Sequence, residues 1–358
     1  MRSFRKKIRN LKTDTMAWFS SKDFKQLMVF VLVVVSFSLS IVYTNVKTYN
    51  PQLAAYIGHN DSIDYVKMYF GEPVWGIRAY RPLVPLLARL VPDLPDWLFT
   101  GERSFDLFTR VAMKFGIVNF FFLLGACVAL YFLQRGFGMS YFESFLGGML
   151  FLSSQTVIRS AGLPMADTAF FFFFLLCMIS IQRNNLWWLL FAHTIGVLAK
   201  ELVILSIPLI LLSLFPWRRK AGMLFVLVPG LLLYGVVRVK FALSPLDDYI
   251  TGGTLRYCPT QLLRLITPNG LINVFLSFGF AWIPALYALA RCKIPLLLKR
   301  WSWLILIIFM GVLLGRGDLG RSTFNAFPVV IPLASLGLSC WLKKGLEEKG
   351  RFDEIQRA

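Results

Sequence analysis

The sequence predicts an all-α, polytopic membrane protein of about ten transmembrane helices, with amphipathic interfacial helices in the first outer loop. Hydrophobic residues make up 57% of the 358-residue chain and charged residues only 16%, whereas roughly 25% are charged in an average soluble domain. Several apolar segments run without a charge for about 15–20 residues, which is the length that crosses a hydrocarbon core. The apolar runs are continuous rather than alternating, which argues against a β-barrel.

The first predicted span runs from about Leu27 to Val42, directly after a strongly basic N-terminal segment, residues 1–25. No small-residue cleavage site follows it convincingly, so we expect a retained signal anchor and not a removed signal peptide. The basic segment should stay in the cytoplasm.

The remaining spans are expected within a single transmembrane domain, residues 26–342, followed by a cytoplasmic tail, residues 343–358. Lys and Arg fall mostly in the predicted cytoplasmic segments and Asp and Glu mostly outside, in agreement with the positive-inside rule. Both termini are therefore predicted to be cytoplasmic, in a bacterial-type inner membrane. The predicted spans are 114–134, 141–158, 166–182, 186–199, 202–216, 221–239, 271–290, 301–315 and 323–342. The long outer loops are 45–113 and 240–270.

The formal net charge of +19 is explained by this distribution, because basic flanks are attracted to anionic inner-leaflet lipids. We therefore expect no nucleic-acid partner. The five cysteines form no CxxC pair and there are only two histidines, so neither a metal centre nor a disulfide framework is predicted.

Two carboxylates in the first outer loop, Asp61 and Asp64, are candidates for catalysis. They are three residues apart, so in a helical turn they share a face. A carboxylate near the membrane interface can act as a general base on an acceptor hydroxyl, or can hold a cation. The alternative is a solvated loop with an Asx cap for a short helix that starts near Ser62.

Two arginines, Arg78 and Arg81, precede Pro82, which can open a helix. The apolar pattern after Pro82 predicts an amphipathic helix lying in the interface. Arginines at the start of such a helix are well placed to bind phosphate through their guanidinium forks. The alternative is ordinary snorkelling of the arginines to the interface.

Further charged residues stand at the predicted outer ends of later spans: Arg159 ahead of Pro164-Met165-Ala166-Asp167, Lys200 and Glu201, and then Arg316, Asp318 and Arg321. The connecting loops are so short that these side chains must lie at membrane level, where ionisable groups indicate a functional site. The aromatic run Phe170–Phe174 covers its helix all round. Lipid contact is the expected role, and a wall for a polyprenyl tail is the alternative.

The pattern Asp61-x-x-x-Tyr65, Gly71, then Tyr80-Arg81-Pro82-Leu83-x-Pro85-Leu86-Leu87-Ala88 resembles the first outer loop of GT-C-type membrane glycosyltransferases. Lys200-Glu201 at the start of a middle span and Arg321 before a Pro-containing late span are similar to further features of that family. The resemblance covers most of the chain.

The resemblance implies transfer of a sugar, with inversion, from a polyprenyl-phosphate donor to an acceptor on the non-cytoplasmic face. It implies that Asp61 is the catalytic base, with Asp64 in reserve. The phosphate-facing set would be Arg78, Arg81, Lys200, Arg316 and Arg321, and Arg159 and Glu201 complete the candidate substrate-binding residues. Because the chain shows no C-terminal soluble domain of the kind found in larger family members, a glycan or lipid acceptor is favoured. No cofactor is implied; a divalent cation at Asp247-Asp248 stays open.

Three other classes are considered. A polymerase or ligase of lipid-linked polysaccharide would use an oligosaccharide on a pyrophosphate carrier. A lipid or glycan transporter, which is not an enzyme, would have inverted repeats and a through-going cavity; mid-span ionisable residues, typical of ion-coupled transporters, are nearly absent. A structural assembly subunit would not need the charged residues at the outer ends.

Overall fold

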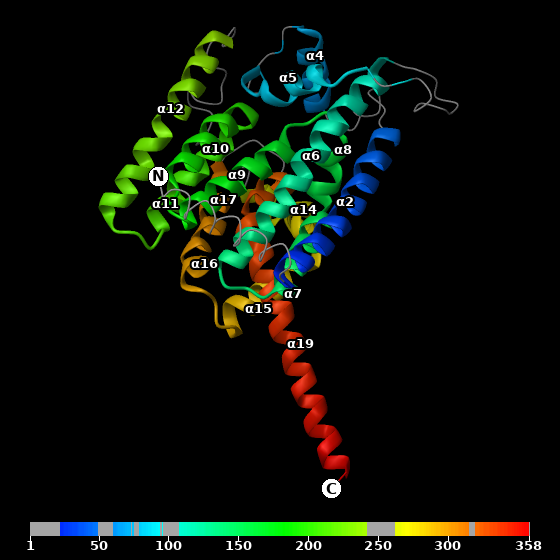
Figure 1. Ribbon diagram of the computed structural model, residues 1–358, viewed down its shortest axis with the longest axis vertical. Coiled ribbons are helices and arrows are strands. Elements are labelled where there is room, and N and C mark those ends of the chain that lie inside the picture. The colour runs from blue at the N-terminus through cyan, green and yellow to red at the C-terminus, as the bar shows by residue number, and fades with distance from the viewer. Residues whose placement is uncertain are drawn as a thin grey trace, which may run out of the picture.

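The computed structural model describes residues 22–48, 60–72, 74, 79–93, 95, 107–241, 262–314 and 319–357, and within these ranges the regular structure is entirely helical. The helices, labelled in Figure 1, are α2 (Lys22–Thr48), α4 (Asn60–Phe70), α5 (Leu83–Leu90), α6 (Leu107–Gly136), α7 (Tyr141–Leu152), α8 (Gln155–Gly162), α9 (Asp167–Gln182), α10 (Leu186–Ala199), the 3-10 helix η3 (Glu201–Leu205), α11 (Ser206–Leu212), α12 (Trp217–Phe241), α14 (Pro268–Phe278), the 3-10 helix η4 (Gly279–Ala281), α15 (Trp282–Arg291), α16 (Leu296–Trp301), α17 (Trp303–Leu314), α18 (Leu319–Thr323), the 3-10 helix η5 (Phe324–Ala326) and α19 (Phe327–Arg357).

The prediction of an all-α membrane protein is confirmed at this level. Within the described ranges, 6 helical segments are long and apolar enough to cross a membrane, or up to 7 if the bent pair α8 and α9 counts as one span. The predicted number of ten is not confirmed, because three of the expected spans are short apolar helices: Tyr141–Leu152, Leu186–Ala199 and Glu201–Leu212. At about 1.5 Å per residue none of these reaches across a core of about 30 Å.

The predicted span 141–158 is wrong as a single helix. Helix α7 begins with a capping box between Ser140 and Glu143 and ends at Leu152. The chain then forms α8, which meets α9 at an angle of 119°. Leu163, between the two helices, has extended backbone angles because it precedes Pro164, and that position disfavours the helical region.

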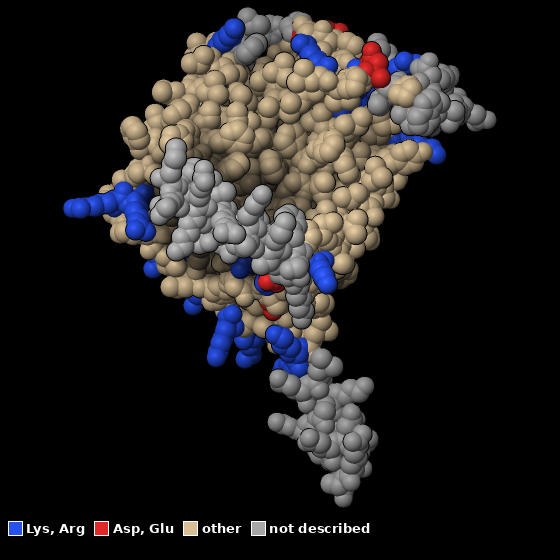
Figure 2. All heavy atoms as spheres, in the orientation of Figure 1, with Lys and Arg blue, Asp and Glu red and all other residues tan. Residues whose placement is uncertain are grey.

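In Figure 1 the long helices form one bundle, α4 and α5 lie together across its upper end, and α19 leaves the lower end as a projecting helix. Helix α9 packs against both α6 and α10, α12 packs on the other side of α10, and α15 packs against α19. The face drawn in Figure 2 has a broad uncharged region, with Lys and Arg side chains at its upper and lower ends and at its left edge. This distribution fits an integral membrane protein.

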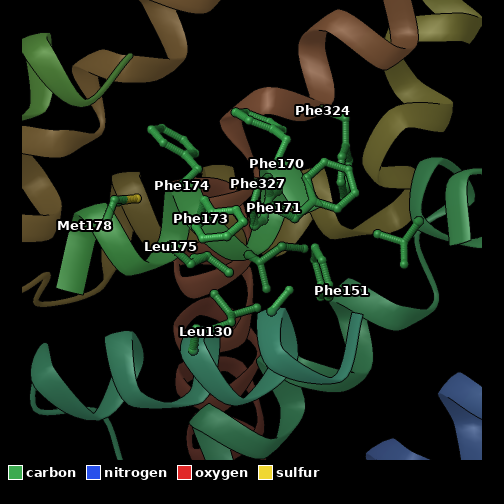
Figure 3. Packing of buried hydrophobic residues seen from close by; sticks show 14 of the residues in the cluster. Leu130, Phe151, Phe170, Phe171, Phe173, Phe174, Leu175, Met178, Phe324 and Phe327 are labelled. Atoms are coloured by element: carbon green, nitrogen blue, oxygen red, sulfur yellow. The ribbon is translucent and has the colours of Figure 1, made fainter. Parts of the chain in front are cut away.

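An aromatic core fills the middle of the bundle (Figure 3). Phe151 of α7, Phe171 of α9 and Phe327 of α19 meet with ring centroids 5.0 to 5.7 Å apart. Phe324 of η5 stacks on Phe327 at 5.4 Å. Such ring pairs add to the free energy gained from burial alone, so they fix α9 relative to the segment that leads into α19.

The expected lipid contact of the Phe170–Phe174 run is wrong for most of its residues. Phe170, Phe171, Phe173 and Phe174 are all buried, and only Phe172 is partly exposed. These side chains point to different sides of α9, and nearly all of them are buried, so this part of α9 is surrounded by other helices of the protein.

Gly337 lies in α19 where α15 packs against it. A Cβ atom at this position would lie 1.9 Å from the backbone carbonyl oxygen of Pro284, which cannot move aside as a flexible side chain would. We expect Gly337→Ala to separate α15 from α19 and to destabilise the protein by about 1–3 kcal/mol, the usual cost of overpacking. The measurement is thermal unfolding of the purified chain in detergent.

Gly235→Ala in α12 is the matched control, because a Cβ there would meet nothing within 4 Å. It should leave the melting temperature unchanged or raise it slightly, since alanine favours helix by up to about 1 kcal/mol over glycine. Equal melting temperatures for Gly337→Ala and the unmodified protein would contradict the close approach of the two helices.

Candidate functional site

Asp61 is placed by α4, in whose first turn it lies. Its side chain is 19% exposed, and Oδ2 accepts a hydrogen bond from Arg321 Nη1 at 2.6 Å. The short helix expected to start near Ser62 is present and begins at Asn60, but the alternative of a merely solvated Asp61 is wrong, because its carboxylate is paired with Arg321 of α18.

Asp167 begins α9 and is almost completely buried, with a side chain only 2% exposed. Its two carboxylate oxygens face different cations: Lys200 Nζ lies 2.7 Å from Oδ1 and Arg321 Nη2 lies 2.5 Å from Oδ2. Lys200 also lies over the Phe170 ring, 5.1 Å from its centroid. A buried carboxylate needs such pairing, because an unpaired charge in an apolar interior is strongly unfavourable.

Arg81 and Glu201 form a second pair beside the first. Arg81 precedes α5 and is buried; its Nε and Nη2 donate to the two carboxylate oxygens of Glu201 at 2.8 and 2.5 Å. This two-point geometry is the strong form of an arginine–carboxylate interaction. Arg81 Nη1 lies 3.4 Å from the hydroxyl oxygen of the buried Tyr65 on α4.

The charge states around Arg81 follow from burial and from its partners. Burial raises the pKa of the Tyr65 hydroxyl, and Arg81 only partly offsets this effect, so Tyr65 stays neutral at physiological pH. Burial by itself would lower the pKa of Arg81, but Glu201 and Tyr65 together raise it well above its ordinary value. Arg81 is therefore a permanent cation at the site.

Helix α5 holds α4 in place through Arg89. Its Nε and Nη2 donate to the backbone carbonyl oxygens of Tyr69 and Met68, both at 2.6 Å. These carbonyls belong to the last turn of α4, where helix carbonyls lack their usual i+4 donors; the Met68 carbonyl also accepts from the backbone N–H of Gly71 at 3.1 Å. The predicted amphipathic helix after Pro82 is confirmed: α5 buries Val84 and Ala88 and exposes Leu86 and Leu90.

The structure brings together five of the residues that the sequence predicted for the site: Asp61, Arg81, Lys200, Glu201 and Arg321. Asp64 lies one turn further along α4 and is half-buried, whereas Arg159 is exposed on α8. Arg78, Arg316 and the Asp247-Asp248 pair lie outside the described residues.

Sequence reasoning missed the central acid of the site. Asp167 stands at the predicted outer end of a short span, which is a signal for a functional residue, but its pairing with Lys200 and Arg321 arises only in the folded chain. Tyr65 is part of the Asp61-x-x-x-Tyr65 pattern, and nothing in the neighbouring sequence indicates that it faces Arg81. Among the described residues, no three His, Cys, Asp or Glu side chains are grouped as metal ligands.

No protein-family model matches this chain, and no curated protein or solved structure matches it. What the site does must therefore be inferred from its own residues.

Replacing Asp167 with Ala should leave Lys200 buried without its acceptor and remove one of the two acids that hold Arg321. We expect a loss of about 3–5 kcal/mol in stability, the usual cost of breaking a buried pair. Thermal unfolding in detergent measures the effect.

Asp93→Ala is the control, since Asp93 pairs with Lys114 but is itself 93% exposed. That change should cost no more than about 1 kcal/mol. Replacing Lys200 with Met in the Asp167→Ala background should restore part of the stability, and a double variant less stable than Asp167→Ala would contradict the assignment.

Proposed function

We propose that this chain is a membrane glycosyltransferase of the GT-C type. It moves a sugar from a polyprenyl-phosphate donor to a glycan or lipid acceptor on the non-cytoplasmic face, with inversion at the sugar carbon. The observation that carries the proposal is the ion-pair network: Asp61, Asp167, Lys200 and Arg321 are linked in one chain, with the Arg81–Glu201 pair beside it.

The network supplies the groups that this reaction needs. An acceptor hydroxyl needs a base, and Asp61 is a carboxylate that is neither fully buried nor fully solvated. The phosphate leaving group gains negative charge as the sugar departs, and Arg321, Lys200 and Arg81 can stabilise it. Asp167 holds two of these cations in position.

The proposed topology has ten spans with both termini in the cytoplasm, in which the three short helical segments cross where the bilayer is locally thinner. Two exposed tryptophans support it: Trp217, 66% exposed, directly precedes Arg218, and Trp341, 59% exposed, lies two residues before Lys343, both at predicted cytoplasmic ends of their helices. Tryptophan prefers the membrane interface. The short helices α10 and η3–α11 meet at Lys200 and Glu201. In the proposed topology this junction lies below the outer surface, in a protein-lined region where short helices can end.

Asp61→Asn should reduce sugar transfer at least about 100-fold, since general-base catalysis typically contributes 10²- to 10⁴-fold. The assay uses the purified full-length chain with a polyprenyl-phosphate-linked sugar. Asp64→Asn, three residues along the same helix, is the matched control and should keep most of the activity.

Both variants must show the melting temperature of a folded protein before the rates are compared. Full sugar-transfer activity in both variants would show that neither carboxylate is the catalytic base. Loss of activity in Asp64→Asn alone would identify Asp64 as the base.

The type of carrier separates the proposed enzyme from a polysaccharide polymerase or ligase. A sugar on a polyprenyl monophosphate should be consumed, and an oligosaccharide on the matching pyrophosphate should not. The reverse preference would favour the polymerase or ligase. Outward movement of a labelled lipid with no transfer of sugar would favour a transporter.

A further inference from the structure

Arg321 is shared by two carboxylates whose surroundings differ greatly. Its Nη2 donates to Asp167, which is 2% exposed and also holds Lys200. Its Nη1 donates to Asp61, which is 19% exposed, and Arg321 itself is 28% exposed. The Nη2 side of the Arg321 guanidinium is therefore held inside the bundle by Asp167, and the Nη1 side pairs with the more exposed Asp61.

The ion pairs of this network are balanced in formal charge. The three cations Arg81, Lys200 and Arg321 face the three acids Asp61, Asp167 and Glu201. Arg321 already holds two carboxylates, Asp61 and Asp167, so an anionic phosphate placed against it would be a third anion on one guanidinium. A third negative charge is repelled strongly at a partly buried site, because screening by water is weak there.

Of the three acids, Asp61 is the one that shares its arginine with another acid and has an oxygen on the more exposed side of that arginine. Asp167 has a cation on each oxygen and no access to solvent, and it lies at the start of α9, where the helix dipole favours a negative charge. Glu201 is held at both oxygens by Arg81. Asp61 shares its cation with Asp167 and is closer to solvent than Asp167.

We propose that Asp61 and the phosphate of the donor lipid are alternative partners of Arg321, so that the arginine passes from the base to the leaving group during the reaction. The inference rests on the proposed function for the identity of the phosphate. It assigns to Asp61 a second role beside that of base: the carboxylate occupies the anion-binding side of Arg321 until a phosphate takes its place.

The bond changes show why this exchange suits the reaction. The acceptor O–H bond breaks and its proton goes to Asp61, while the acceptor oxygen forms a bond to the sugar C1. The bond from C1 to the phosphate oxygen breaks, and its electron pair stays on that oxygen. Asp61 becomes neutral as the phosphate gains one negative charge, so the total charge around Arg321 is unchanged.

The test is the binding of farnesyl phosphate, a short polyprenyl monophosphate, to the full-length chain in detergent, with uncharged farnesol as the matched probe. Asp61→Asn should lower the dissociation constant for farnesyl phosphate at least about fivefold, the equivalent of one partly exposed ion pair. The dissociation constant for farnesol should not change. Adding Arg321→Gln to Asp61→Asn should abolish the gain.

Glu72→Gln is the control for a general change in charge, because Glu72 is exposed just beyond the end of α4; it should bind farnesyl phosphate as the unmodified protein does. A dissociation constant in Asp61→Asn equal to that of the unmodified protein would overturn the exchange. So would a gain that persists when Arg321 is replaced.

A second measurement uses the unmodified protein and does not depend on the stability of any variant. Saturating farnesyl phosphate should increase the labelling of Asp61 by a carbodiimide, read by mass spectrometry, because the carboxylate is released from Arg321. Unchanged or decreased labelling would overturn the exchange.

Failure of this inference and failure of the proposed function give different results. If the unmodified protein transfers sugar but Asp61→Asn does not bind farnesyl phosphate more tightly, the proposed exchange of partners on Arg321 is rejected and the proposed enzyme activity stands. If Asp61→Asn binds farnesyl phosphate more tightly but the unmodified protein transfers no sugar, the enzyme activity is rejected and a phosphate-binding site on Arg321 stands.

Discussion

The buried carboxylate of Asp167 is the constraint on which the described ion-pair network depends. It draws together segments that are far apart in the sequence: the start of α9, the junction of α10 with η3, and α18. A charge at this depth is tolerated only when it is paired and hydrogen-bonded. The position of Asp167 therefore fixes where Lys200 and Arg321 must lie, and Arg321 in turn fixes Asp61.

The aromatic core beneath the network holds the same segments by a different force. Phe170 and Phe171 follow Asp167 on α9, while Phe324 and Phe327 follow Arg321 into α19. Ring packing is short-ranged and cannot be satisfied in a shifted register without leaving cavities. The aromatic contacts therefore set the distance between α9, which carries Asp167, and the segment that carries Arg321. Rigid packing of this kind is needed to hold charged side chains in a precise arrangement.

The sequence predicted the helical class, the helix after Pro82 and five residues of the network, because hydropathy, proline chemistry and charge at membrane level are local signals. It did not predict the break at Pro164 or the burial of the Phe170–Phe174 run. Both depend on which helices surround α9, and a run that is apolar all round looks the same in lipid as in protein. Asp167 was missed for the same reason: its importance comes from Lys200 and Arg321, which approach it only in the folded chain.

The attachment of α5 to α4 through Arg89 has a mechanical consequence. Arg89, near the end of α5, donates to the backbone carbonyl oxygens of Met68 and Tyr69 near the end of α4, so the two short helices are joined at their C-terminal ends. Asp61 begins α4 and Arg81 directly precedes α5, so the other ends of the two helices are bound to the bundle through neighbouring ion pairs, Asp61–Arg321 and Arg81–Glu201. Because the helices are also joined to each other, moving either of them away from the bundle would strain both ion pairs.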